Sequence, residues 1–292
     1  MIVEKFIPGA ITGFFDICHS PNIENAGTTG FSVCISKGLF VKMEAIPSEG
    51  NSFTCHTDGK RSVNPVSEYV HAAMAPGIKD TYDITFTYTP EVEIGAGFGM
   101  SGATALGTAF CLAKLQDIKI DPKEVAYMAD AATQGGYGDV ISQLNGGAML
   151  RTTPGIGSRL IGLDTEGLKI VCAIFGPLST KDILKDEKMV KNIKREGSMC
   201  LTEAMAGPGI CNIMSLCRRF SKRIGLETPR LAEAIDAVSS ANSMPASMSM
   251  LGESLFLFAR EEALPKIADV LGSFDANIMV CDVWRKKNAS TH

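Results

Sequence analysis

The chain has 292 residues, 45% hydrophobic and 21% charged, with a formal net charge of −4 at pH 7. These proportions are typical of a globular protein and exclude an intrinsically disordered or collagen-like chain. The mild acidity argues against a protein that coats nucleic acid. No apolar run approaches the ~18 residues of a membrane span, and the first residues do not resemble a signal peptide. We therefore expect a cytoplasmic protein with no nucleic-acid or membrane partner.

Short runs of apolar and β-branched residues predict strands along the chain. The predicted strands are residues 2–7, 31–35, 39–45, 82–88, 168–175 and 277–283, with a hairpin over 148–152 and 159–163. Pro8-Gly9 is a turn signal that closes the first run, and Lys37-Gly38 separates the next two. Apolar and polar side chains alternate over residues 82–88, which predicts a strand with one exposed face in an antiparallel or mixed sheet.

Three helix starts are marked by a capping residue followed by proline. They are Asn64-Pro65, with a helix to about Ala75, Asp121-Pro122, with a helix to about Ala132, and Thr228-Pro229. A helix rich in small residues runs from Ser101 to about Leu115. A short helix begins near Asp139, after Gly135, Gly136 and Gly138, and ends at Gly146-Gly147. Strands come first and helices later, which predicts an α+β protein in two parts that meet near residues 164–167.

The most informative segment is residues 93–104, Glu-Ile-Gly-Ala-Gly-Phe-Gly-Met-Ser-Gly-Ala-Thr, between a predicted strand and a predicted helix. Glycines allow backbone N–H groups to approach an anion, and a helix N-terminus adds partial positive charge. The pattern favours a phosphate-binding loop, in which Ser101 contacts a phosphate or a phosphate-bound Mg²⁺. The alternative is a tight strand-to-helix turn that merely needs glycine.

Gly97, Gly99 and Gly102 also match the dinucleotide pattern G-x-G-x-x-G. A dinucleotide fold requires a buried parallel strand before the loop, and the polar face of residues 82–88 argues against one. The Gly-Lys-Ser/Thr of a P-loop and the His-Arg-Asp and Asp-Phe-Gly of a protein kinase do not occur in the chain.

Three segments together resemble the GHMP kinases, which phosphorylate galactose, homoserine, mevalonate and phosphomevalonate. They are Ile-Pro-Gly-Ala-Ile-Thr-Gly-Phe-Phe-Asp at residues 7–16, the glycine loop at residues 97–104, and Gly136-Tyr137-Gly138-Asp139. Within that family, the Ile-Thr-Gly-Phe-Phe run, Gly-Asp-Val-x-x-Gln at residues 138–143 and Met250-Leu251-Gly252 most resemble archaeal-type pantoate kinase. The resemblance spans residues 8–258.

The resemblance implies an α+β, two-domain GHMP kinase fold. Residues 1–165 would form a ribosomal protein S5 domain 2-like N-terminal domain, and residues 166–292 a ferredoxin-like C-terminal domain. The implied activity is phosphorylation of the primary hydroxyl of pantoate to 4-phosphopantoate in coenzyme A biosynthesis, with ATP and Mg²⁺ as cofactors. Pantothenate is the alternative substrate; an NAD(P)-dependent oxidoreductase or an inactive nucleotide-binding relative are remoter alternatives. A homodimer is also implied.

The resemblance assigns roles to individual residues. Asp139 would be the catalytic base, Ser101 and Asp130 would hold Mg²⁺, and the remaining residues would bind ligands. For the nucleotide these are Gly95, Gly97, Gly99, Met100, Ser101, Gly102 and Ala103; for the substrate they are Thr28, Thr29, Tyr127 and Arg151.

Each of these roles has a plainer alternative. Asp139 could serve merely as a helix N-cap, and Asp130 could be a solvated side chain. Arg151 could be a surface charge, and Tyr127 could be a core residue. Phe14 or Phe15 could supply an apolar wall for the substrate.

The chain also departs from the family pattern. Met100 replaces a usual serine, Tyr127 a histidine and Asp130 a glutamate, and the third signature is reduced to residues 247–252. These departures bear on the substrate more than on the reaction.

Overall fold

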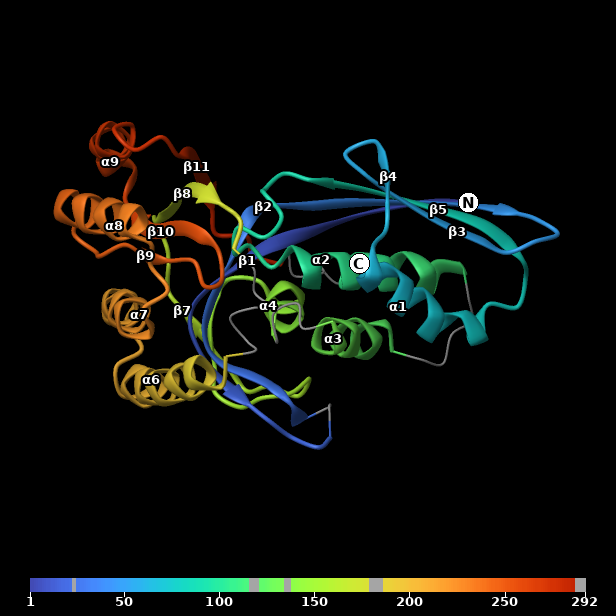
Figure 1. Cartoon of the computed structure of the whole chain (residues 1–292), viewed down its shortest axis with the longest axis horizontal. Helices are drawn as coiled ribbons and strands as arrows, with labels where there is room; N and C mark the ends of the chain where they lie inside the picture. The colour runs from blue at the N-terminus through green and yellow to red at the C-terminus, as the bar shows by residue number, and fades with distance from the viewer. Residues whose placement is uncertain (23–24, 116–120, 134–137, 179–185, 287–292) are drawn as a thin grey trace.

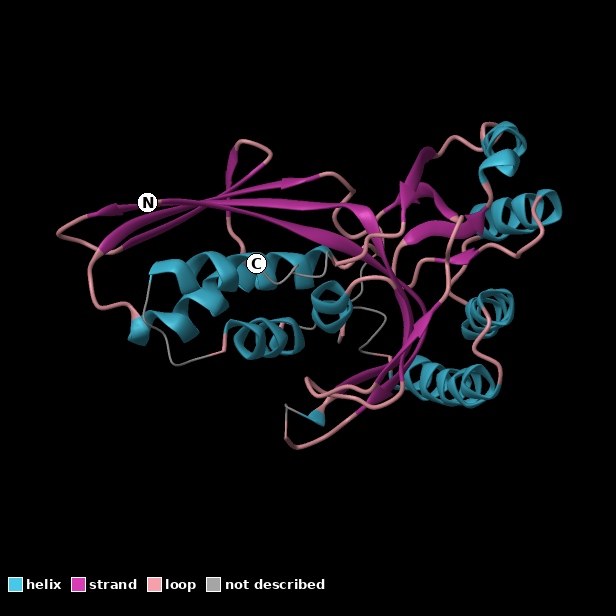
Figure 2. Ribbon diagram, turned by 180° about the vertical axis from the view of Figure 1, so that it is seen from behind, coloured by secondary structure: helices cyan, strands magenta, loops and turns pink. Residues whose placement is uncertain are grey.

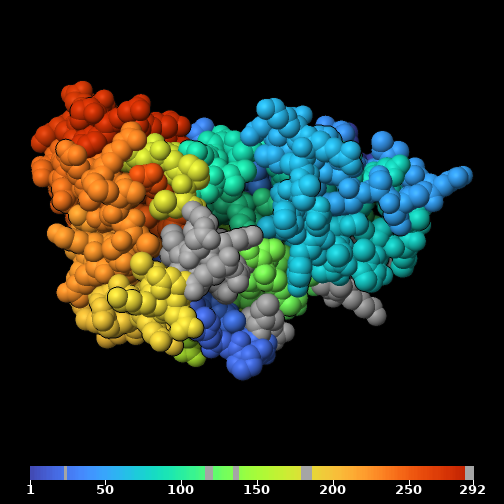
Figure 3. Space-filling model, in the orientation of Figure 1, coloured from blue at the N-terminus to red at the C-terminus, as the bar shows by residue number. Residues whose placement is uncertain are grey.

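The computed structural model describes residues 1–22, 25–115, 121–133, 138–178 and 186–286. Gly135, Gly136 and Tyr137, which were used in the sequence comparison, lie outside the described residues. Two parts of the chain lie side by side, and the long strands β1 (Ile2–Cys18) and β2 (Gly27–Pro47) run along the N-terminal part and then bend down between the two parts (Figure 1). The space-filling view shows the orange and red C-terminal part on one side and the blue-to-green N-terminal part on the other (Figure 3).

The N-terminal part is built on a mixed sheet. Within the described residues it has seven strands in the order β4-β3-β5-β2-β6-β7, with β1 paired to β2, and only β3 and β5 pair in parallel. The strands are β1 (Ile2–Cys18), β2 (Gly27–Pro47), β3 (Ser52–Thr57), β4 (Lys60–Ser62), β5 (Tyr82–Pro90), β6 (Ala148–Arg151) and β7 (Leu160–Leu163).

Helices cover one face of this sheet (Figure 2). They are α1 (Pro65–Met74), α2 (Met100–Leu112), α3 (Pro122–Ala132) and α4 (Asp139–Asn145), with 3₁₀ turns at Ala75–Gly77 and Ala113–Leu115. Helix α2 is buried nearly all round, which its run of small residues permits. Helix α4 lies at the N-terminal end of α2, where the glycine loop enters it (Figure 1).

The C-terminal part is an antiparallel sheet with helices packed on it. In the described chain its strand order is β11-β8-β10-β9. The elements are β8 (Lys169–Gly176), α6 (Glu187–Ala206), α7 (Ile210–Ile224), α8 (Pro229–Ala241), β9 (Ser247–Met248), β10 (Glu253–Ala259), a 3₁₀ turn (Glu261–Ala263), α9 (Leu264–Leu271) and β11 (Asn277–Asp282).

The predicted division at residues 165/166 lies in the connection between β7 and β8 and stays a prediction. After β11 the chain returns to the N-terminal sheet, where Val283 pairs with Ile35.

The predicted helix starts are confirmed by their caps. Asn64 and Thr228 each accept a bond from the backbone N–H three residues later, and Asp121 accepts one from Lys123 N. The alternation over residues 82–88 is also confirmed, because Ile84, Phe86 and Tyr88 are buried in the core. The predicted hairpin is the β6–β7 pair.

The prediction that the chain turns at Pro8-Gly9 is wrong. Strand β1 continues through these residues, and β2 continues through Lys37-Gly38 opposite them. The pairing changes register between Pro8 and Gly9, which is a β-bulge. A Cβ on Gly38 would lie 2.1 Å from the carbonyl oxygen of Ile7, so glycine is required by the close approach of the two strands. The turn dipeptides therefore mark an irregularity within one long hairpin.

Apolar packing joins the two parts of the chain. The rings of Phe14 and Phe15 in β1 lie 6.4 and 5.8 Å from the ring of Phe220 in α7. All three side chains are buried. Phe14 and Phe15 thus belong to the core between the two parts, which argues against their role as a substrate wall.

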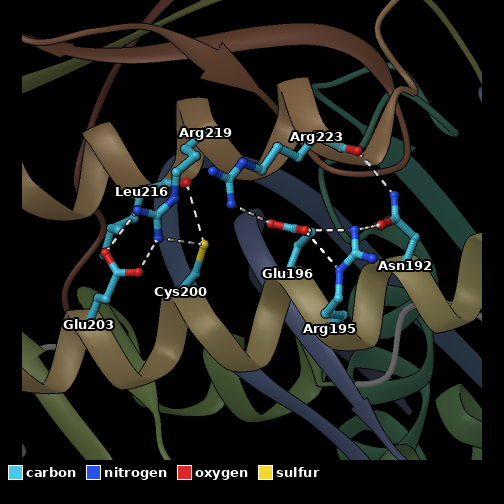
Figure 4. Close-up of polar contacts among 8 residues, drawn as sticks. All are labelled: Asn192, Arg195, Glu196, Cys200, Glu203, Leu216, Arg219 and Arg223. Carbon is cyan, nitrogen blue, oxygen red and sulfur yellow. Dashed lines mark hydrogen bonds and ion pairs between the residues drawn. The ribbon is translucent and has the colours of Figure 1, made fainter.

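Two ion pairs join α6 to α7, and a third lies within α6 (Figure 4). Arg219 binds Glu203 at 2.7 Å, and Glu196 lies between Arg223, at 3.1 Å, and Arg195, at 2.9 Å. Both flanking arginines are largely exposed, so we assign these pairs a modest contribution to stability. The described residues contain no helix that is both long enough and apolar enough to cross a bilayer.

Helix α6 packs directly on the backbone of β1, and we predict that Gly197→Ala destabilises the protein. An added Cβ would lie 2.0 Å from the carbonyl oxygen of Phe15, and backbone cannot move aside cheaply. The expected loss in the free energy of unfolding is about 2 kcal/mol or more, measured by urea denaturation. The matched control is Gly209→Ala, where a Cβ would meet nothing within 4 Å. Equal stabilities of the two variants would contradict this packing.

Candidate active site

The glycine loop is held by its carbonyl oxygens. Five consecutive carbonyls, from Gly95 to Gly99, each accept a hydrogen bond from a different part of the chain. The donors are Leu178 N at 3.1 Å, Ser254 Oγ at 2.6 Å, Ser249 Oγ at 2.7 Å, Ala10 N at 2.9 Å and Gln143 Nε2 at 2.9 Å, in that order. In a trans peptide the N–H points away from the carbonyl. Anchoring the carbonyls therefore turns the N–H groups of residues 97–100 away from the protein partners, whereas the Ala96 N–H donates to the carbonyl of Glu93 at 3.3 Å.

The backbone of the loop suits an anion. Gly95, Gly97 and Gly99 all have positive φ, at 86°, 87° and 67°, and such alternation creates concave groups of N–H donors. Gly99 is the N-cap of α2, so the first N–H groups of this helix have no partner within it. Met100 and Ala103 are buried in the first turn. The Met100 N–H has no partner within the helix, so a serine at position 100 is not needed for phosphate binding by the backbone. The Ala103 N–H already donates to the carbonyl of Gly99 at 3.0 Å.

Residues 247–252, the reduced third signature of the family, contact the glycine loop from the C-terminal part. A Cβ on Gly252 would lie 2.0 Å from the carbonyl carbon of Ala96. The Met250 N–H donates to the carbonyl of Thr12. Residues 249–252 thus touch both the glycine loop and β1, although they lack the glycine-rich form of the family signature.

Asp139 lies against the same loop. A Cβ built on Gly99 would lie 3.0 Å from its carboxyl carbon, and one on Gly102 would lie 3.0 Å from its Cβ. Asp139 is the first residue of α4, whose N-cap is Gly138, and no side-chain capping bond is made. The alternative that Asp139 merely caps a helix is therefore wrong.

Asp130 is buried at 1% exposure, so the alternative of a solvated side chain is wrong. Neither carboxylate oxygen accepts a hydrogen bond of normal geometry from the described residues. Burial raises the pKa of Asp130 to about 7, and the nearby Gly138 N–H and Ser101 hydroxyl offset this only in part. Two unpaired carboxylate oxygens beside a hydroxyl match the oxygen ligands that Mg²⁺ prefers.

Arg151 is buried at 1% exposure, which excludes the surface alternative. Its guanidinium donates to the hydroxyls of Ser32 at 2.8 Å and Ser142 at 2.7 Å, and to Thr28 Oγ1 at 3.1 Å. It forms no ion pair with any carboxylate among the described residues. A buried cation without an acidic partner is costly unless an anion joins it.

Charge links Asp130, Asp139 and Arg151. Burial and the neighbouring charge of Asp130 raise the pKa of Asp139, and the positive charge of Arg151 lowers it in part. A strongly perturbed carboxyl next to a phosphate-binding loop is typical of catalytic sites.

Besides Arg151 itself, three residues were predicted to bind the substrate. Two of them lie near Arg151 and one does not. Thr28 bonds Arg151, and Tyr127 is buried near it, donating its hydroxyl to the carbonyl of Ala26. Thr29 pairs with Asp16 in the β1–β2 ladder, on the face opposite to Thr28. The structure therefore brings Thr28 and Tyr127 to Arg151 and turns Thr29 away.

Five residues contribute to the site although the sequence analysis did not assign them to it: Ser32, Ser142, Gln143, Ser249 and Ser254. Gln143 could have been found, because it lies four residues after Asp139 and so on the same helical face. Ser32, Ser249 and Ser254 carry no such local signal, because their partners lie more than 100 residues away along the chain.

Comparison with known proteins identifies the family. Residues 64–147 match the model of the GHMP kinases N-terminal domain. The chain is 31% identical over 281 residues to a pantoate kinase of Methanocaldococcus jannaschii, covering 96% of this chain and 99% of that one. This chain is a member of the GHMP kinase family. A pantoate kinase of Thermococcus kodakarensis is also 31% identical, over 98% of this chain and 97% of its own.

Solved structures agree with the family fold. A protein described as a phosphotransferase related to the coenzyme A biosynthesis pathway superposes with a TM-score of 0.91 and 28% identity, covering 98% of this chain and 97% of that one. A homoserine kinase from Cytophaga hutchinsonii gives a TM-score of 0.70 at 16% identity, covering 97% and 95%, which shows the shared fold alone. The predicted two-domain GHMP kinase fold is confirmed. The dinucleotide alternative is wrong, because the strand before the loop, β5, lies in a mixed sheet and pairs in parallel with β3 but antiparallel with β2, which is not the parallel sheet of a dinucleotide-binding fold.

We predict that Asp130→Asn stabilises the ligand-free protein at alkaline pH. The folded-state pKa of about 7 lies above the ordinary value of 3.8, so the penalty for the buried charge is complete above pH 7 and fades as pH falls. The expected gain is about 2 kcal/mol at pH 8, with a smaller gain at pH 5. Thermal unfolding at the two pH values measures it, and a variant less stable than wild type at pH 8 would contradict the unpaired carboxylate.

Proposed function

We propose that this chain is a pantoate kinase, which transfers the γ-phosphoryl group of ATP to the primary hydroxyl of pantoate. The observation that carries the proposal is the buried guanidinium of Arg151, which forms no ion pair within the described residues and lies near Asp139 and the glycine loop. The names of the two archaeal relatives support the choice of substrate. The product would be 4-phosphopantoate, an intermediate of coenzyme A biosynthesis.

The loop would bind the triphosphate of ATP. Its anchored carbonyls leave the N–H groups of residues 97–102 for phosphate oxygens, and the start of α2 adds the positive end of a helix dipole. Phosphoryl transfer needs mainly positioning and charge stabilisation, which such a cradle supplies.

Ser101 and Asp130 would hold Mg²⁺. The orphaned carboxylate oxygens of Asp130 fit the ion, which supplies charge neutralisation on the transferring phosphate when bound. These two residues bring the ion to the N-terminal turn of α2, next to the anion cradle.

Asp139 would act on the acceptor hydroxyl. Its carboxylate lies at the surface of the glycine loop, so a substrate alcohol between the carboxylate and the γ-phosphate can donate its proton to a carboxylate oxygen. The contribution of such a base is roughly 10²–10⁴-fold in rate.

Arg151 would bind the carboxylate of pantoate. Gly138, the residue before Asp139, lies against this arginine: a Cβ there would be 3.2 Å from Arg151 Nε. The cation and the base are therefore close neighbours, which suits a substrate whose carboxylate and primary hydroxyl are separated by three carbon atoms. In pantothenate the carboxylate lies farther out, beyond an amide, so Arg151 favours pantoate. A homodimer and a cytoplasmic location stay predictions.

The variant Asp139→Asn tests the assigned base. The amide keeps the shape of the side chain but cannot take a proton, so kcat for pantoate should fall by about 10²–10⁴-fold. ATP binding, measured by calorimetry, should stay within a few-fold, because the phosphate cradle is built from backbone. A variant with wild-type kcat and an intact fold would overturn the role of Asp139.

A further inference from the structure

Helix α4 touches both halves of the site through adjacent residues. Gln143 is 2% exposed and donates from Nε2 to the carbonyl of Gly99 at 2.9 Å. That carbonyl also accepts the first intrahelical bond of α2, from Ala103 N at 3.0 Å. Both acceptor sites of the oxygen are then used. Gln143 therefore fixes the residue at which the phosphate loop becomes a helix.

Ser142 makes the matching contact on the substrate side. Its hydroxyl accepts from Arg151 Nη1 at 2.7 Å and lies 2.7 Å from Ser32 Oγ. A guanidinium can only donate, so both serine oxygens act as acceptors toward Arg151. Either serine can be the donor in their mutual contact, and the Ser142 hydroxyl also lies within hydrogen-bond distance of the carbonyl of Gly138, at 3.3 Å. Arg151 is thus tied to the residue that precedes the base.

We propose that Ser142 and Gln143 are positioning residues that make α4 a rigid bridge, with Gln143 setting the phosphate loop and Ser142 setting Arg151 relative to Asp139. The inference rests on the proposed function and deepens it. Neither residue touches a reacting atom; each acts through a group that does.

The bridge explains two features of α4. The helix has only seven residues, and the first five, Asp139 to Gln143, are all buried. A short helix gains little stability from its own hydrogen bonds, so its orientation depends on side-chain contacts at its surface. One polar contact to each ligand-binding element fixes the base between the elements, which catalysis by positioning requires.

The two contacts predict opposite kinetic signatures. Gln143→Met keeps the volume and loses the donor, so the Kd for ADP and the KM for ATP should rise about tenfold, with the KM for pantoate unchanged. Ser142→Ala should raise the KM for pantoate about tenfold, with the KM for ATP unchanged. A tenfold change matches the loss of one hydrogen bond in each variant. Gln143→Met loses the bond to the glycine loop, and Ser142→Ala loses the charge-assisted bond from Arg151. In both variants kcat should fall several-fold.

The matched control is Ser67→Ala. It also removes a buried hydroxyl, bonded to Tyr88 in the N-terminal core and away from α4. Its KM values should equal those of wild type, although its stability falls. The only tryptophan, Trp284, packs on Gly146 at the end of α4, so its fluorescence shows whether the helix stays seated in each variant.

The outcomes separate this inference from the proposed function. A wild-type protein that binds ADP but does not phosphorylate pantoate would refute the proposed function, and the ADP affinity of Gln143→Met would still test the loop contact. If wild type is active and both variants change the two KM values in parallel, or if ADP affinity is unchanged in Gln143→Met, the bridge is wrong.

Discussion

The site depends on one constraint, the anchoring of five consecutive carbonyl groups in the glycine loop. A loop of small residues has little side-chain surface with which to fix itself, and glycine makes its backbone more flexible. Here the anchors come from β1, from α4 and from three places in the C-terminal part. The loop conformation that we propose binds phosphate therefore depends on both parts of the chain being folded and packed together.

The close packing of the loop against α4 accounts for the glycines that face Asp139. Gly99 and Gly102 leave the space that the Asp139 side chain occupies, and any Cβ there would meet it at 3.0 Å. The base can thus approach the helix start where phosphate is expected. Close approach of a carboxylate and a phosphate is electrostatically unfavourable, so the site needs cations. In the proposed function Arg151 would provide one from the protein, and the oxygens of Asp130 and Ser101 would provide a place for a second.

The predictable features were those that local chemistry determines. The dipeptides Asn64-Pro65 and Asp121-Pro122 mark helix starts because a cap and a fixed φ act within one turn. Asp139 follows a glycine that begins a helix, and the family pattern singled it out. These signals lie within a few residues of each other, so one sequence is enough to find them.

The features that escaped prediction arise from contacts between distant segments. Pro8-Gly9 resembles a turn, yet the pairing with Gly38 makes it a bulge within a long strand. Thr28 and Thr29 look equivalent in the sequence, and only the strand face separates them. The hydroxyls of Ser249 and Ser254 bond carbonyls more than 150 residues away. No local pattern distinguishes these serines from solvated ones, because their role depends on tertiary packing.

The measurement that tests the central claim most directly is the rate of ADP release by the purified chain with ATP and Mg²⁺, with pantoate and pantothenate assayed in parallel. The account predicts turnover with pantoate and a kcat/KM for pantothenate at least about 100-fold lower, because Arg151 lies beside the base. Equal or preferred turnover of pantothenate would contradict the assignment of Arg151 to the substrate carboxylate.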